Sequence, residues 1–170
     1  MDRIMMIATS DDLDADARSV HDRIVESRGE VSRPFQMLLH VPPMARAVAE
    51  LGHVVRFGSH LADADRELVT LATGRALGCR FVWESHLAGA IGAGVTPGAI
   101  AALQGDRRGL DDRGRALVAF VDELSGTNTV SDRSFGVVHE LLDTPGTVEL
   151  AVTIGYYTML GRVMGAGRAC

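Results

Sequence analysis

The chain has 170 residues, the length of one ordinary domain with room for a sizeable hydrophobic core. Hydrophobic residues make up 46% of it, which predicts a globular protein, and the net charge of −5 argues against nucleic acid binding because phosphate contacts need a basic surface. All 17 cationic residues are Arg, which excludes a lysine Schiff base and a P-loop.

Cysteine usage and the start of the chain indicate a compartment. Cys79 and Cys170 are too few for a disulfide framework, so we expect a reducing, cytoplasmic location and assign no role to Cys170 at the chain end. Acidic residues follow Met5, Met6 and Ile7 at once, unlike a signal peptide, and no apolar run reaches membrane-spanning length. We therefore expect no membrane partner.

Hydrophobic spacing predicts helices along the chain, and no alternation of Val, Ile and Thr indicates a strand. Ser10 is expected to cap a first helix that has acidic residues in its first turn (11–14) and ends near Gly29. A short helix at 32–39 and a longer one at 42–57 follow, each with Pro near its start. The fold class is therefore expected to be all-α, with about eight helices.

The middle of the chain predicts a pair of consecutive helices. Asp63 or Asp65 is expected to cap the first, and Gly74 inside it predicts a close approach by a neighbouring backbone. The second helix occupies 79–93, and Gly94 suits the left-handed residue that ends it.

Further helices are expected at 97–103, 111–124 and 131–142. Thr144 and Pro145 then open the last helix, which is apolar nearly all round from residue 148 to residue 164. A small domain has little room to bury such a helix completely, so we expect it to be buried in part at a subunit interface of a homo-oligomer.

Reactive side chains gather between residues 67 and 86. Cys79 and His86 are seven residues apart in one predicted helix, which places both on one face, with Val82 between them. Glu67 belongs to the preceding helix, and two antiparallel neighbours could bring its carboxylate against the imidazole. A carboxylate, a thiol and an imidazole would then form a small reactive constellation.

This spacing resembles the carboxymuconolactone decarboxylase and alkyl hydroperoxidase D superfamily, whose members carry Glu, then Cys, then His, then a Gly-Val/Leu-Thr/Ser turn. The chain has Gly-Val-Thr-Pro at 94–97, and the segments 35–42 and 155–159 also look like family segments. Peroxidase members place a second Cys where this chain has Val82, and many decarboxylase-like members place Glu there.

The resemblance extends over most of the chain, from about Phe35 to about Ala166. It implies an alkyl hydroperoxidase D-like fold in a single domain (1–170), with an N-terminal arm and helix (1–33) before the family core (34–166). It also implies assembly into trimers or hexamers.

Each member of the constellation has a structural alternative. Cys79 stands at a helix N-terminus beside Arg80, which favours the thiolate, but free Cys is also a common small buried hydrophobe. His86 could be a hydrogen-bonded core histidine. Glu67 could be a structural carboxylate that holds Arg75 or a helix end.

Other residues are candidates for binding a substrate. Arg56 or His60 could hold a carboxylate, although His60, like His53, could equally be a surface or interface histidine. Trp83 is expected to pack and Glu84 to be exposed. A polar thread on the last helix is interpreted as a buried hydrogen-bonding network first and a pocket wall second: Glu149, Thr153, Tyr156 and Tyr157. The candidate substrate-binding set is Arg56, His60, Val82, Trp83 and Tyr156.

Three functions follow from these residues. The first is a cofactor-independent lyase or isomerase acting on a small carboxylated lactone or β-keto acid, with His86 and Glu67 as an acid–base pair. The second is a thiol peroxidase using Cys79, for which Val82 offers no resolving thiol. The third is an inert oligomeric helical protein. Glu67, Cys79 and His86 fit no standard metal-binding spacing, so neither a metal nor a cofactor is expected.

Overall fold

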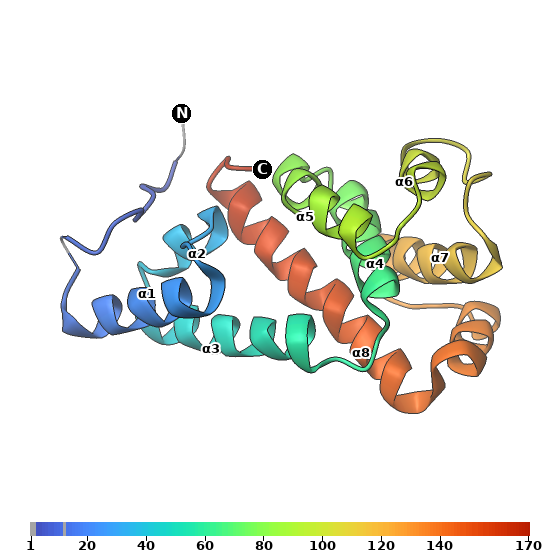
Figure 1. The fold of residues 1–170 in the computed structure, drawn as a ribbon, viewed down its shortest axis with the longest axis horizontal. Coiled ribbons are helices and arrows are strands. Elements are labelled where there is room, and N and C mark those ends of the chain that lie inside the picture. Colours follow the sequence, from blue (N-terminus) through green and yellow to red (C-terminus); the bar gives the residue numbers. More distant parts are fainter. Residues whose placement is uncertain (1–2, 12) are drawn as a thin grey trace. The chain divides into compact units, whose positions relative to one another are not determined.

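The computed structural model describes residues 3–11 and 13–170, and within them every regular element is a helix (Figure 1). This confirms the all-α prediction with eight α-helices. Their bounds, with one π-helix (η1), are α1 Ala15–Arg28, α2 Arg33–Leu38, α3 Pro42–His53, η1 Val54–Gly58, α4 Asp63–Ala76, α5 Arg80–Gly92, α6 Pro97–Gln104, α7 Asp112–Thr127 and α8 Asp132–Ala166. No helix of the described chain is long and apolar enough to cross a membrane.

The helices form two compact units. The first contains the chain up to Gly58 together with Arg162–Ala169, and the second contains Ser59–Gly161 together with Cys170. In the first unit, α1, α2 and α3 enclose a small core, whose buried side chains are Val20, Ile24, Val31, Phe35, Leu39 and Ala45.

The first helix begins later than the sequence predicts. Asp14 is its N-cap, and the Asp14 side chain accepts a hydrogen bond from the Ala17 amide at 2.9 Å. The prediction that Ser10 caps this helix is wrong, because the carboxylate of Asp14 satisfies one of the free amides at the helix start. Asp12, in the predicted acidic first turn, lies outside the described residues.

The second unit is built around α4, which packs against α5 and α7. Its larger core draws on most helices of this unit and includes Leu71, Leu117, Val121 and Leu150, all without exposed surface. A β-carbon at Gly74 of α4 would lie 3.0 Å from a methyl carbon of Val82 and 3.2 Å from the Trp83 backbone nitrogen. This confirms the predicted close approach at Gly74.

The start of α4 differs from the prediction. The N-cap position is Ala62, without a side-chain hydrogen bond, so neither Asp63 nor Asp65 caps the helix. The carboxylate of Asp65 instead accepts hydrogen bonds from Arg113 of α7, at 3.0 Å from Nε and 2.7 Å from a terminal guanidinium nitrogen. A planar guanidinium fork binds a carboxylate at two points, and this draws Asp65 away from the helix end.

Two helical segments make up α8. Asp143 interrupts the helix with φ 58° and ψ −172°, and its side chain accepts the Gly146 amide at 3.0 Å. Pro145 follows in the first turn of the second segment, where its missing amide proton costs nothing. The predicted end of one helix near residue 142 and start of another at 144–145 are confirmed.

Candidate acid–base site

Glu67 and His86 lie on two consecutive helices joined by a short turn. Gly78 has φ 63°, a left-handed conformation that glycine adopts without a steric penalty. The Cys79 amide donates to the Gly74 carbonyl at 2.9 Å, which closes the turn. The turn lets α5 fold back along α4, as Figure 1 shows for these two neighbouring helices.

The side chains of Glu67 and His86 meet. His86 Nδ1 lies 2.9 Å from Glu67 Oε2, and the two side chains are only 18% and 14% exposed. An ionised carboxylate can only accept, so the Nδ1 proton is donated to Glu67. The other ring nitrogen, Nε2, is then the atom left to take or give a proton. The predicted approach of the carboxylate to the imidazole is confirmed, whereas a catalytic role stays a prediction.

Three further residues complete the surroundings of this pair. The ring of Tyr157 from α8 meets the His86 ring edge-on, with centroids 4.8 Å apart. A guanidinium nitrogen of Arg66 lies 4.0 Å from Glu67 Oε1. A β-carbon at Gly89 would lie 3.5 Å from Glu67 Oε2, so this glycine leaves the carboxylate room. Sequence reasoning missed Arg66 and Gly89, and placed Tyr157 only in a polar thread.

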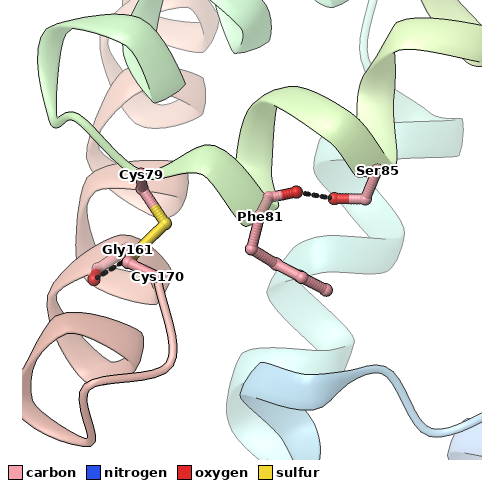
Figure 2. Close-up of a disulfide and its surroundings, with 5 residues drawn as sticks. All are labelled: Cys79, Phe81, Ser85, Gly161 and Cys170. Carbon is pink, nitrogen blue, oxygen red and sulfur yellow. Dashed lines mark hydrogen bonds between the residues drawn. A yellow bond between two sulfur atoms is a disulfide. The ribbon is translucent and has the colours of Figure 1, made fainter.

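Cys79 does not carry a free thiol. It forms a disulfide with Cys170, and Figure 2 shows the bond at the start of α5. The predictions of a nucleophilic thiolate or a free buried thiol at Cys79, and of no role for Cys170, are therefore corrected. The turn that follows α8, with Arg168 at φ 58°, reverses the chain and brings Cys170 back beside Gly161. A separation of 91 residues hid this pairing from the sequence.

Val82 and Trp83, predicted to bind substrate, make packing contacts. Val82 is 4% exposed and lies against Gly74, and Trp83 packs against the core of the second unit. Tyr156 is 3% exposed and meets Tyr157 edge-on, with centroids 5.1 Å apart. Substrate binding by these residues stays a prediction.

His60 already has a carboxylate partner. Glu149 accepts hydrogen bonds from His60 Nδ1, from the His60 amide and from the Ser59 hydroxyl, each at 2.8 Å. The His60 side chain is 87% exposed, in agreement with the surface interpretation. Arg56 lies in η1 of the first unit, where its guanidinium is 5.2 Å from the ring centroid of Phe57. The predicted carboxylate-binding role of both residues stays a prediction.

The structural alternative for Glu67 is not the one that the sequence offered. Arg75 binds Asp122 of α7, and a terminal nitrogen of Arg107 binds the other oxygen of Asp122 at 2.7 Å. Arg75 therefore has its own carboxylate, and Glu67 is directed to His86. Among residues 3–11 and 13–170, no group of three or more His, Cys, Asp or Glu side chains is placed to hold a metal ion.

Comparisons with known proteins place the fold. Residues 42–108 match the model of the carboxymuconolactone decarboxylase family. No curated protein matches the chain. An uncharacterised peroxidase-related protein from Silicibacter sp. TM1040 has a TM-score of 0.79 at 17% identity, and the match covers 98% of this chain and 90% of that one.

Two more solved structures are similar. A peroxidase-related protein with an alkylhydroperoxidase AhpD core, from Ralstonia eutropha JMP134, has a TM-score of 0.79 at 18% identity, covering 99% of this chain and 91% of that one. The apo debrominase Bmp8 has a TM-score of 0.75 at 16% identity, covering 92% and 86%. The chain therefore has an alkylhydroperoxidase D-like fold with a carboxymuconolactone decarboxylase family region at residues 42–108, which confirms the resemblance seen in its sequence.

Proposed function

We propose that the protein is a cofactor-independent lyase or isomerase that acts on a small carboxylated lactone or β-keto acid, with His86 as the proton donor or acceptor. The observation that carries the proposal is the 2.9 Å contact between His86 Nδ1 and Glu67 Oε2. Both side chains are largely buried, so water competes little with this hydrogen bond.

Glu67 orients the imidazole in this mechanism. The carboxylate accepts the Nδ1 proton and thereby holds the ring in one orientation, with Nε2 as the reacting atom. It also stabilises the imidazolium that forms when Nε2 takes up a proton. Tyr157 limits the tilt of the ring, because its own ring meets His86 nearly at a right angle, at 83°.

The reaction assigned to the site is loss of CO₂ beside a carbonyl. When the bond to the carboxylate carbon breaks, its electron pair stays on the substrate as an enolate. The imidazolium of His86 stabilises this negative charge and then donates the Nε2 proton to carbon. An isomerase would use the same two atoms, with Nε2 first removing a proton from carbon and then returning it to another position.

The test is turnover of a panel of carboxylated lactones and β-keto acids by the full chain, measured as CO₂ release and loss of substrate. We expect Glu67→Gln to reduce kcat by about tenfold to a hundredfold, because the amide no longer fixes the imidazolium. Arg66→Gln is the matched control on the neighbouring residue and should keep more activity than Glu67→Gln. Full activity in Glu67→Gln, with a substrate that the wild-type chain turns over, would refute the acid–base pair.

A thiol mechanism is the second candidate, because the structure pairs Cys79 with another cysteine. The structural neighbours described as peroxidase-related are compatible with it but share only 17% and 18% identity with this chain. A hydroperoxide assay of the reduced chain beside the lyase panel separates the two candidates.

A further inference from the structure

The two sulfur atoms of the disulfide have unlike surroundings. Cys79 is 1% exposed, in the interior at the start of α5, whereas Cys170 is exposed at the end of the chain. An external thiolate must approach a disulfide sulfur directly, along a path that solvent can also reach. It can therefore reach this bond from the Cys170 side, and attack there releases Cys79.

Cys79 is well placed to leave as a thiolate. It occupies the N-cap position of α5, where free amides and the helix dipole create a partial positive charge. The first turn of α5 contains no acidic residue and begins with Arg80, whose Nε lies 3.4 Å from Glu84 one turn further on. A helix N-terminus stabilises a thiolate, and a stabilised thiolate is a good leaving group in disulfide exchange.

Gly161 of α8 keeps both cysteines together. The Cys170 Sγ lies 3.3 Å from the Gly161 carbonyl oxygen, the contact drawn beside the disulfide in Figure 2. Once the bond is reduced, this oxygen can accept the S–H proton of Cys170 and hold the thiol in place. A β-carbon at Gly161 would lie 3.8 Å from the Cys79 β-carbon, so the same glycine lets α8 pass close to Cys79.

The residue three positions after Cys79 cannot serve as its partner. Val82 carries no sulfur and is packed against Gly74. Cys170, brought in from the end of the chain, supplies the second thiol that the α5 helix lacks.

We propose that Cys79 and Cys170 form a reversible dithiol–disulfide centre that exchanges two electrons with an external dithiol or disulfide. This activity is separate from the acid–base chemistry of Glu67 and His86, and neither depends on the other. The substrate class is a small or peptide-borne dithiol that can reach the end of the chain.

The exchange proceeds in two balanced steps. A thiolate of the dithiol attacks Sγ of Cys170, a new S–S bond forms, and the bond to Cys79 breaks with its electron pair leaving on Cys79. The second thiol of the dithiol, as its thiolate, then attacks the sulfur of its own molecule in this mixed disulfide and releases Cys170 as a thiolate. The dithiol has lost two electrons and two protons, and the two protein sulfurs have gained them; the reverse steps oxidise the protein with an external disulfide.

The first experiment measures how fast dithiothreitol reduces the disulfide of the full wild-type chain, in native buffer and in denaturant, by alkylating the released thiols and weighing the products. We expect the native rate to lie within about a hundredfold of the denatured rate, because Cys170 is exposed. A native rate slower than this would make the bond a structural cross-link and overturn the proposal. No variant needs to fold for this test.

The second experiment determines which sulfur is attacked. In Cys79→Ser the remaining thiol is Cys170, and in Cys170→Ser it is Cys79. With oxidised glutathione as the probe, we expect Cys170 to form a mixed disulfide about tenfold faster or more than Cys79, and the difference to vanish in denaturant. An equal or slower reaction of Cys170 in the native state would contradict attack at the exposed sulfur. His86→Ala is the control and should exchange at the wild-type rate, so the outcome is independent of the lyase proposal.

Discussion

Glu149 of α8 holds both the ring and the backbone of His60, 89 residues earlier in the chain. The hydrogen bond and the charge of Glu149 raise the pKa of His60 above its ordinary 6.5. Burial works to raise the pKa of Glu149, but hydrogen bonds from His60 and Ser59 outweigh it and lower this pKa below 4.5. The raised pKa stabilises the fold below pH 6.5 and this contribution is lost as pH rises through it; the lowered pKa stabilises the fold above pH 4.5 and is lost as pH falls through it.

The pair should therefore contribute most to stability between pH 4.5 and 6.5. We expect Glu149→Gln to lower the denaturant midpoint most in that window, and less as pH rises past the folded pKa of His60. Urea unfolding of the variant and the wild type across the pH range checks this. Glu140→Gln, at an exposed carboxylate on the same helix, is the control. A pH-independent loss in Glu149→Gln would contradict the ionic coupling.

Gly74→Ala should destabilise the second unit. The added methyl group would stand 3.0 Å from a methyl carbon of Val82 and 3.2 Å from a backbone nitrogen, too close without movement of α5. Overpacking of this kind costs about 1–3 kcal/mol of unfolding free energy. Gly155→Ala, at a helical glycine with nothing within 4 Å of the new methyl, is the matched control and should be neutral or stabilising. In the double variant Gly74→Ala/Val82→Ala, part of the loss should be recovered.

The ion pair between Asp65 and Arg113 should matter more than the pairs on the surface. The Asp65 side chain is 11% exposed and the Arg113 side chain 39%. Asp65→Asn should cost about 1–3 kcal/mol in chemical denaturation, discounted from the fully buried case because Arg113 reaches solvent. Asp112→Asn removes the pair with Arg115, where Asp112 is 99% exposed, and should change stability by less than about 0.5 kcal/mol. Equal losses in the two variants would refute this ranking.

Self-association should depend on α8. Val148 and Val152 are 56% and 41% exposed and stand four residues apart, so they share one face of the helix. We expect the chain to form a homo-oligomer, as a trimer or hexamer, and Val148→Arg to weaken it. Light scattering at micromolar concentration measures the mass, with Glu140→Arg as the control for added charge on α8. A wild-type monomer would contradict the prediction.

Local patterns in the sequence predict the acid–base pair well. Glu67 and His86 are 19 residues apart on helices joined by a short turn, so helical period and chain reversal are enough to bring them together. Gly74 was predicted for the same reason, as a small residue inside an otherwise regular helix. The Ser10 and Asp63/Asp65 caps were wrong because several polar residues near a helix start compete for the same amides.

Distant pairings were not predictable from the sequence. Cys170 reaches Cys79 only because the chain reverses after a long helix, and Glu149 reaches His60 only because α8 passes the loop before α4. In each case the two residues are about 90 positions apart, and neither helical period nor turn chemistry specifies such a contact.

The activity of His86→Ala, compared with that of Cys79→Ser/Cys170→Ser, tests the acid–base account most directly. Both variants are assayed on whichever carboxylated substrate the wild-type chain converts, with circular dichroism to confirm folding. We predict a loss of about a hundredfold or more in kcat for His86→Ala, which removes the proton carrier, and a loss of less than about tenfold for the double serine variant, which leaves Glu67 and His86 in place. If the double serine variant is inactive while His86→Ala keeps its turnover, the reaction proceeds through sulfur and the acid–base account is wrong.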